Sequence, residues 1–485
     1  MSTFGGLNTA FSGLTAARAG LDVVGQNIAN VNTEGYTRQR VTTSSAAGAA
    51  RAGLVAWGAT PGTGVTVDGI ARLGSTTLDA KVRATAAIAG YTAVRANALG
   101  SIENSLNEPG DNGLSDQLQE FWAGWSELAN SSDRTTAANL LLGEAQQLTS
   151  QIATGYRAVT TEWASVRSSA DALVSEVNVA ATQVGTLNGI IRQTLATGGS
   201  ANELIDKRDA LISTISAITG ASVRAQADGT VDVLVAGNTL VSGTDVLSLA
   251  VSGPTTMPTG SGTAEAVRVV WSHRPETVAV DGGELAGALS LLGPADGGKG
   301  GALAEAAASY DKFATHLVTT VNTIHQKGAV SDQPDKAALL NFFSCDPAHA
   351  AATIGVIPKD ASGIAAGIPG DGAANGGIAD AIAQLGAGRA IDDAGNAVAS
   401  PDTLWSAFVT KLGVDTGLEL AQAKVANQSA SSAVTLQLSN SSVDLDEENV
   451  NLLTFQHAYQ GAARVMTAVD EMLDTLINRT GLVGR

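Results

Sequence analysis

Residues 441–485, SSVDLDEENVNLLTFQHAYQGAARVMTAVDEMLDTLINRTGLVGR, decide how this chain is organised. Apolar residues recur there every seven positions in two rows offset by three, which is the pattern of a coiled-coil seam. The two rows are Leu445, Leu452, Tyr459, Met466 and Leu473, and Phe455, Ala462, Val469 and Leu476. The acidic residues at 444 and 446–448 fall in the first turn, where the helix dipole favours negative charge. We therefore expect a helix of about 50 Å whose apolar stripe needs a partner.

The other end of the chain carries a matching seam. Its rows are Leu7, Leu14, Leu21 and Ile28, and Ala10, Ala17, Val24 and Val31. The simplest arrangement pairs the two terminal helices and loops the rest of the chain out between them, although heptads alone do not name their partner. The first helix, expected over residues 4–29, runs into a turn-rich stretch containing Asn30, Asn32 and Gly35. Asparagine and glycine tolerate left-handed backbone angles, so the helix should stop there.

Composition excludes several classes of function. The chain has 485 residues, enough for roughly two to four domains, and a net charge of −18. That charge argues against a nucleic-acid surface or docking on an anionic membrane, and it indicates solubility. No apolar run is long enough to span a membrane. The single cysteine, Cys345, allows no intrachain disulfide and is expected to be a small buried hydrophobe. The N-terminus has no basic region before an apolar core, so no cleaved secretory signal is expected, and these features alone favour the cytoplasm.

Between the termini, hydrophobic periodicity predicts a mainly α chain with an inserted β-rich module. A 3–4 alternation that runs without a break from Ile152 to Ile191 predicts a long bundle helix. Further helices are expected over 76–108, 114–128, 202–219, 301–327 and from 401 onward. Short strands are expected within 36–75 and over 221–281, and a glycine-rich linker should follow residue 281. Residues 328–400 show little hydrophobic periodicity. The expected domains are a terminal axial coiled coil (1–35 with 441–485), a helical bundle (36–220 with 282–327 and 401–440) and an outer β-rich module (221–281 with 328–400).

A search for catalytic motifs leaves one enzymatic alternative. The stretch GPADGGKG, Gly293 to Gly300, has the spacing of a phosphate-binding loop with Lys299 in the lysine position, but Gly300 replaces the hydroxyl residue that holds magnesium. A nucleotide-binding enzyme is therefore kept as an alternative. The histidines form no zinc-binding spacing, and His457 is expected on a helix surface. With no cofactor, metal site or catalytic set predicted, the pattern favours a structural or interaction protein over an enzyme.

Two terminal segments resemble a known family. Residues 25–40, GQNIANVNTEGYTRQR, and the stretch ending AYQGAARVMTAVDEMLDTLIN resemble the terminal signatures of bacterial flagellar axial proteins, the rod, hook and hook-associated family. The N-terminal motif maps onto Asn27, Asn30, Asn32, Gly35 and Tyr36. Glu34 stands where many members carry proline, but Gly35 and the asparagines preserve the turn. NELIDKRDALISTISAITGASV (202–223) and VNTIHQKG (321–328) resemble internal segments of the members that lie at the hook–filament junction.

This resemblance implies a structural adaptor between flagellar hook and filament that polymerises through its terminal helices. The implied location is extracellular, after export through the flagellar type III channel without a cleaved signal, which overrules the cytoplasmic expectation. The implied partners are further copies of the chain in a ring or short helical layer, the hook protein, the next hook-associated junction protein and a cytoplasmic export chaperone. The expected interface residues are Leu7, Leu14, Leu21, Ile28, Leu445, Leu452, Phe455, Tyr459, Met466, Val469, Leu473 and Leu476. A hook or distal-rod protein is the alternative, and it would have a mainly β middle.

Overall fold

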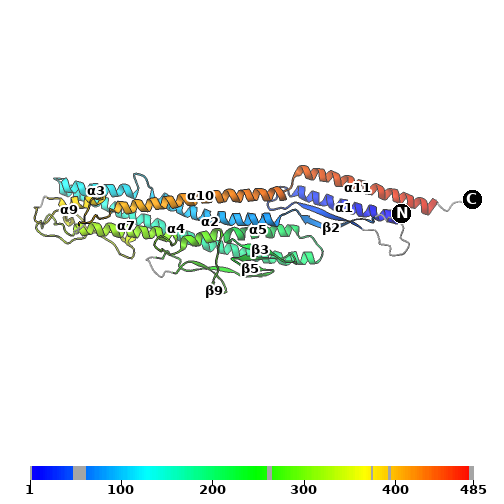
Figure 1. The fold of residues 1–485 in the computed structure, drawn as a ribbon, viewed down its shortest axis with the longest axis horizontal. Helices are drawn as coiled ribbons and strands as arrows, with labels where there is room; N and C mark the ends of the chain where they lie inside the picture. Colours follow the sequence, from blue (N-terminus) through cyan, green and yellow to red (C-terminus); the bar gives the residue numbers. More distant parts are fainter. Residues whose placement is uncertain (1–2, 47–61, 259–264, 373–374, 392–394, 480–485) are drawn as a thin grey trace, which may run out of the picture.

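The chain forms an elongated rod whose two ends lie at the same extremity (Figure 1). A computed structural model describes residues 3–46, 62–258, 265–372, 375–391 and 395–479. Residues 47–61 of the expected strand region, and the extreme ends of the expected terminal coiled coil, lie outside these ranges. The chain runs out along the rod, turns at the far end and returns through a long helix (Figure 1).

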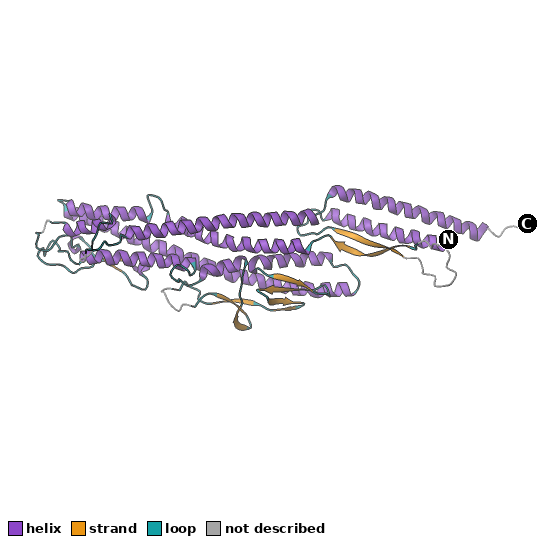
Figure 2. Ribbon diagram, in the orientation of Figure 1, coloured by secondary structure: helices purple, strands orange, loops and turns teal. Residues whose placement is uncertain are grey.

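Helices make up most of the rod, which confirms the prediction of a mainly α chain (Figure 2). They are α1 Thr3–Ala29, α2 Thr76–Leu106, α3 Leu114–Asn130, α4 Arg134–Ala196, α5 Asn202–Thr219, α6 Gly283–Leu292, α7 Ala302–His325, α8 Ala350–Thr353, α9 Gly377–Gly386, α10 Pro401–Ser441 and α11 Leu445–Asp474, with short helical turns at Ala361–Gly363 and Thr475–Arg479. The longest, α4, has 63 residues and begins where the Asp133 side chain accepts from the Thr136 amide. Most of its heptad residues, including Ile152, Trp163 and Ile191, are buried as predicted, and Leu173 and Leu187 are half-buried.

Helix α6 was missed by the sequence analysis, which expected a glycine-rich linker after residue 281. The stretch GELAGALSLL is almost wholly buried against α2, α4 and α5. A helix that is apolar on every side shows no amphipathic period, so its pattern cannot be told from that of other buried segments. Gly287 allows close packing, because a Cβ there would lie 2.7 Å from the Tyr91 carbonyl oxygen.

The strands form small antiparallel sheets. They are β1 Gln39–Ala46, β2 Gly64–Arg72, β3 Ser222–Ala225, β4 Val231–Val235, β5 Asn238–Ser242, β6 Asp245–Val246, β7 Leu249–Ser252, β8 Arg268–Trp271, β9 Arg274–Thr277, β10 Phe343–Ser344 and β11 Gly355–Val356. The hairpin β1–β2 lies on α1, while β5, β6 and β7 contact α4. Asn188 of α4 binds the carbonyls of Val231 and Gly243, which fixes the sheet β3–β6 to the helix.

Residues 328–400 lie at the far end of the rod, apart from the strands of 221–281 with which they were grouped (Figure 1). Among the described residues the two segments share no sheet. Side chains of α7 hold 328–400 in place instead: Asn322 binds the backbone of Phe342 and Phe343, and His325 binds Leu340 and Ala365. Hydrophobic periodicity does not predict which segments such polar contacts join, so the position of 328–400 could not be derived from it.

Candidate functional site

The two terminal helices lie side by side and antiparallel (Figure 1). The closest approach is made by glycines of α1, which are spaced by seven. A Cβ on Gly6 would lie 3.7 Å from the Val469 side chain, and one on Gly13 would lie 3.8 Å from the Cβ of Ala462. A Cβ on Gly20 would lie 2.5 Å from the ring of Phe455. Moving seven residues forward along α1 therefore leads to a contact seven residues earlier in α11, as expected for an antiparallel pair.

The predicted seam residues fall into two groups in the single chain. The enclosed ones are the half-buried Leu7, Leu14, Leu21, Ile28, Leu452, Phe455, Met466 and Leu473 and the buried Val469. The exposed ones are Leu445, Tyr459 and Leu476. The heptad reading left out the glycine row one position before the leucines, because glycine adds nothing to a hydrophobic pattern.

The next step of seven beyond Gly20 and Phe455 reaches a polar pair, Asn27 and Glu448. The Asn27 amide donates to Glu448 Oε2 at 3.0 Å and to the Gln39 carbonyl at 2.9 Å. Its Oδ1 accepts from the Tyr36 hydroxyl at 2.9 Å and from the Gln39 amide at 3.0 Å. All four bonds of Asn27 are thus made with polar groups of the turn at Tyr36, of the start of β1 at Gln39 and of α11. A buried polar pair in an apolar seam fixes register, since any slip leaves it without partners.

Arg38 completes the same contact from the start of the hairpin. Its Nε donates to Glu448 Oε1 at 2.8 Å, and its Nη1 lies 2.6 Å from Glu447 Oε2. The Arg38 amide also donates to the Ser441 carbonyl at the end of α10. Arg38 therefore bridges the break between α10 and α11, where Asp444 caps α11 by accepting from two amides of its first turn.

A second arginine, at the end of the hairpin, holds the helical part of the rod. Arg72 lies 2.5 Å from Asp206 and 3.1 Å from Asp209 of α5. Asp206 also accepts from the Thr37 amide at 3.2 Å. Since Gln39 and Arg72 are opposite each other in the hairpin, both arginines lie at its base. We call Asn27, Arg38, Arg72, Asp206 and Glu448 the polar hub.

Burial and charge shift the pKa values around the hub. Burial, then the carboxylates of Asp206, Glu203 and Glu448, raise the pKa of Tyr36 to about 12. Burial lowers the pKa of Arg38, but hydrogen bonds to Glu447 and Glu448 outweigh it and leave the value raised. Tyr36 therefore stays a neutral donor and Arg38 stays charged across the physiological range.

The N-terminal motif is thereby divided into two roles. Asn27 and Tyr36 belong to the hub network, whereas Asn30 and Gly35 form the turn that ends α1. Asn30 donates to the Gln26 carbonyl, and Gly35 has a φ of +77°. Asn32 is exposed. Sequence reasoning read Glu448 as part of the helix-start charge and missed Arg38, Arg72 and Asp206. The one signal for Arg38, Asp206 and Glu448 was that they lie within the segments that resemble flagellar proteins, and Arg72 had no such signal.

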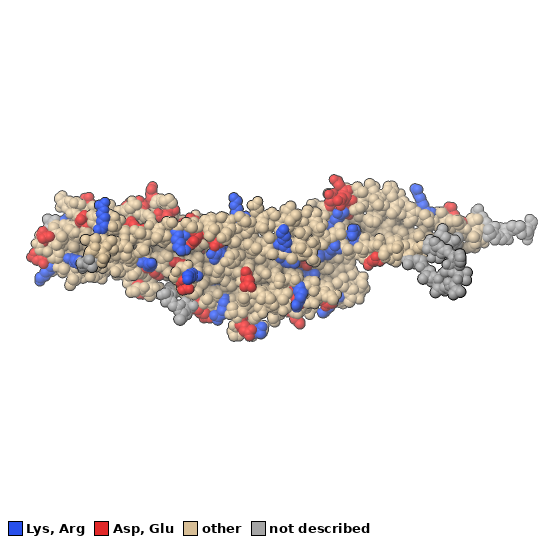
Figure 3. All heavy atoms as spheres, in the orientation of Figure 1, with Lys and Arg blue, Asp and Glu red and all other residues tan. Residues whose placement is uncertain are grey.

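The side of α11 that faces away from α1 is exposed and carries large apolar side chains. Residues 449–463 contain no Asp, Glu, Lys or Arg. Large exposed side chains recur along this side at Val450, Leu453, Val465 and Met472, and His457 is also exposed, as expected for a helix surface. Figure 3 shows a long tan stretch along α11 beyond the acidic cluster at its start. We call these residues the outer face of α11, and it has the composition of a surface that is covered in an assembly.

The loop that resembles a phosphate site is occupied by the protein itself. Glu305 Oε1 accepts from the amides of Asp296 at 2.6 Å and Gly300 at 3.0 Å. Burial raises the pKa of Glu305, but these amide bonds outweigh burial and lower it overall, so the carboxylate is charged. The amides that a phosphate loop would direct at an anion already bind this carboxylate. The geometry therefore gives no support to nucleotide binding at Lys299.

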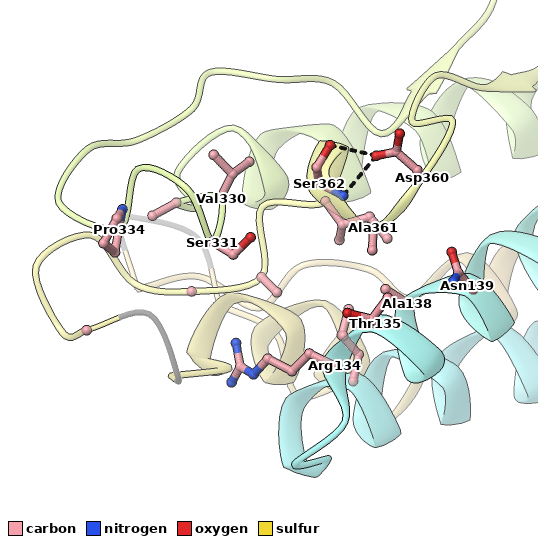
Figure 4. A pocket seen from close by; sticks show the side chains of 16 residues that line it. Arg134, Thr135, Ala138, Asn139, Val330, Ser331, Pro334, Asp360, Ala361 and Ser362 are labelled. Atoms are coloured by element: carbon pink, nitrogen blue, oxygen red, sulfur yellow. Dashed lines mark hydrogen bonds between the residues drawn. The ribbon is translucent and has the colours of Figure 1, made fainter.

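A pocket of about 450 Å³ lies at the far end of the rod, between the start of α4 and the loops around 330 and 361 (Figure 4). Its charged groups are engaged in structure: Asp360 accepts from the Ser362 amide and hydroxyl, and Arg134 donates to the Asn375 carbonyl. No cluster of metal-ligating side chains occurs in the described part of the chain. Within the same residues, no helix is both long and apolar enough to cross a membrane.

The hub unites three of the four segments that resemble flagellar axial proteins, and comparison with known families assigns the rod to that class. Three family descriptions match the chain. "Flagellar hook-associated protein FlgK helical domain" matches residues 99–342, half of the chain; "Flagellar basal body rod FlgEFG protein C-terminal" matches 437–479; and "Flagella basal body rod protein" matches 7–37. More particularly, the chain belongs to the flagellar hook-associated protein FlgK family. It is a structural component of the bacterial flagellum.

Proteins similar to this chain are named for association with the flagellar hook. "Flagellar hook-associated protein 1" of Bacillus subtilis is 29% identical over the full length of both chains. The Escherichia coli protein of that name is 31% identical over 50% of this chain and 44% of its own length, so the match spans less than half of that relative. A solved structure, the flagellar hook junction protein FlgK from Burkholderia pseudomallei, has a TM-score of 0.60 over 74% of this chain and all of the other, with 14% identity. That likeness supports the fold.

Proposed function

We propose that the chain is an adaptor at the junction between flagellar hook and filament, and that it polymerises through its paired terminal helices. The observation that carries the proposal is the outer face of α11, which is exposed and, over residues 449–463, uncharged on a chain of net charge −18. The relatives' names, which refer to hook association and to the hook junction, support the location. The mainly helical middle disfavours the hook or distal-rod alternative, which requires a β middle.

In this proposal the terminal pair is the axial domain, and copies pack into a ring or short helical layer. The hook protein lies below and the next hook-associated junction protein lies above. A cytoplasmic chaperone covers the apolar α11 before export through the type III channel, because an uncovered apolar face aggregates.

Deletion of the gene tests the location. We expect finished hooks without filaments, with unpolymerised flagellin in the medium. Missing hooks would assign the protein to the hook or rod. Normal swimming would exclude both the junction role and a role in the hook or rod.

Seam variants test the mechanism in the deletion strain. Leu452→Asp or Leu14→Asp should abolish incorporation while the helical middle stays folded, because a carboxylate cannot be buried in the seam without a partner. Far-ultraviolet circular dichroism of the secreted chain checks folding. Normal filaments from either variant would show that the seam is not the polymerising element.

A further inference from the structure

The peptide bond between Asp346 and Pro347 is the only Asp–Pro bond in the chain, and it lies between β10 and α8. Bonds of this kind are among the most acid-labile in proteins, because the aspartate side chain can attack its own backbone carbonyl carbon. The proline nitrogen then leaves as a secondary amine, which binds a proton readily. Asp346, Pro347 and Ala348 are exposed, so water reaches the bond. Its reactivity therefore depends on how the fold holds the carboxylate and the carbonyl group.

The fold holds both groups in a tight turn. The Ala348 amide donates to Asp346 Oδ1 at 3.0 Å, and the His349 amide donates to the Asp346 carbonyl oxygen at 3.0 Å. Proline suits the second position of such a turn, because its ring fixes the backbone. The first amide orients the attacking carboxylate, and the second polarises the carbonyl group and is aimed at the oxygen on which negative charge would develop.

The backbone on both sides of the turn is fastened to the rod. The Asp346 amide donates to the Thr353 hydroxyl at 2.8 Å, and the Ala351 amide of α8 donates to Asp311 of α7 at 2.8 Å. On the other side, Asn322 of α7 binds the backbone of β10. The reacting groups are thereby kept in one arrangement, which lowers the entropy that an attack within the residue must lose.

Three titratable side chains lie around the turn: Asp311, the half-buried Cys345 and His349. Burial raises the pKa of Asp311, and it outweighs the opposing effects of the Ala351 amide and of His349. Burial, then Asp346 and Asp311, raise the pKa of the Cys345 thiol. Asp311 therefore takes up a proton more readily than an exposed carboxylate does, and in mild acid it adds a proton donor beside the turn.

We propose that Asp346–Pro347 is a self-cleavage site, at which the folded chain cuts its own backbone in mild acid. A carboxylate oxygen of Asp346 attacks the Asp346 carbonyl carbon and forms a C–O bond, and the C–N bond to Pro347 breaks. The electron pair of the broken bond stays on the proline nitrogen, which takes a proton and leaves as an amine. The resulting anhydride joins the two carboxyl groups of Asp346, and water hydrolyses it. The products are residues 1–346 and 347–485.

The cut leaves the rod assembled. The first product contains α1 and α2, and the second contains α10 and α11. Because α1 packs on α11 and α2 packs on α10, the two products stay together until a denaturant separates them. Self-cleavage is independent of the junction role, since it is a reaction of the single chain.

Incubation of the purified full chain tests the proposal. At about pH 5 the two products should accumulate over days on denaturing gels, and at about pH 7.5 they should form more slowly, because the leaving nitrogen needs a proton. Hydroxylamine added at about pH 5 should intercept the anhydride and leave a hydroxamate on Asp346, which mass spectrometry detects. Circular dichroism at the same pH checks that the chain stays folded.

Variants and a denaturant separate this reaction from its alternatives. Pro347→Ala and Asp346→Glu should each slow cleavage at least about tenfold, because one loses the leaving group and the other the short reach of the carboxylate. Asp335→Glu, at another exposed aspartate, should cleave at the natural rate. The folded chain should also cleave roughly tenfold faster than the chain unfolded in urea at the same pH, since only the folded chain keeps the turn.

Equal rates in the folded and unfolded chains would overturn the proposal, because the turn would then contribute nothing. Cleavage of Pro347→Ala at the natural rate would overturn it as well, and so would products that never carry the hydroxamate. Both of these results are expected of a contaminating protease.

Discussion

Glu447 and Glu448 are neighbours in the sequence and both bind Arg38, but only Glu448 is enclosed. The Glu448 side chain is 1% exposed and that of Glu447 is 61% exposed. The periodicity of α11 could not separate them, because their difference depends on Asn27 and Arg38, which lie some four hundred positions away. Contacts between single polar residues that lie far apart in the chain could not be predicted, because a single sequence does not show which of these residues meet in the fold.

Replacing Glu448 by Gln should destabilise the terminal pair by roughly 2–3 kcal/mol. The change removes the charge that pairs with Arg38, and the effect stays below that of a wholly buried pair because Arg38 keeps part of its side chain in water. Glu447→Gln is the matched control and should cost less than about 1 kcal/mol. Denaturant unfolding monitored on α11 measures both values, and equal effects would mean that the burial of Glu448 is unimportant.

His325 should make the helical part of the rod sensitive to acid. It is buried, its Nδ1 lies 2.7 Å from the Leu340 carbonyl, and its Nε2 accepts from the Ala365 amide at 2.9 Å. This arrangement requires a neutral ring, and burial lowers the pKa of His325. The unfolded chain then binds the extra proton, so stability is full above about pH 6.5 and is lost as pH falls through that value toward the lower folded pKa.

Thermal unfolding between pH 8 and pH 5 tests this expectation. The melting temperature should fall more steeply with acid in the natural chain than in His325→Gln, so the difference between the two proteins should shrink as pH falls. His273→Gln, which replaces an exposed histidine, should keep the natural slope. A slope unchanged by His325→Gln would assign the acid sensitivity to other groups.

At the scale of elements, regular local patterns were predicted well and close backbone approaches were not. The buried row of α4 follows from its spacing alone, because every third or fourth residue of a helix shares a face. The contact of α1 with α11 depends instead on Gly6, Gly13 and Gly20, which let the two helices approach closely because they have no side chain. Glycine lowers helix propensity, so the property that permits the contact weakens the signal for the helix.

Gly20→Ala should weaken the pairing of α1 with α11 by about 1–3 kcal/mol. The added methyl collides with the ring of Phe455, and overpacking outweighs the gain in helix propensity. Gly25→Ala is the control: nothing lies near its Cβ position, so it should stabilise α1 by about 0.5–1 kcal/mol. Helicity and hydrogen exchange of α1 report both changes. Restored pairing in Gly20→Ala with Phe455→Leu would identify the ring as the cause.

For the whole molecule, the rod joins a well-buried helical part to a more exposed terminal pair. α4 and α7 bury large side chains such as Trp163 and Phe313, whereas most of the seam between α1 and α11 is half-buried. The long helices and the outward-and-return course of the chain were predicted, whereas α6, α8 and α9 were not. The separate places of 221–281 and 328–400 were not, because their positions depend on Asn188, Asn322 and His325 rather than on any repeating pattern.

The terminal pair should therefore open independently of the rest. In hydrogen exchange on the secreted monomer, amides of α1 and α11 should exchange faster than those of α4, because fewer buried contacts oppose their opening. Glu448→Gln should speed exchange in α1 and α11 and leave α4 and α7 unchanged. Uniform acceleration along the whole rod would indicate that the molecule unfolds as one unit.

The hydrogen bond between Asn27 and Glu448 spans 421 positions of the chain, and this separation has a consequence in time. A ribosome completes residue 27 early and residue 448 near the end, so α1 has no partner for most of synthesis. The same delay recurs whenever the chain is threaded in order through a narrow passage. Broken or stalled chains that lack 448 never acquire the register pair, and only chains finished through that point can form the paired unit.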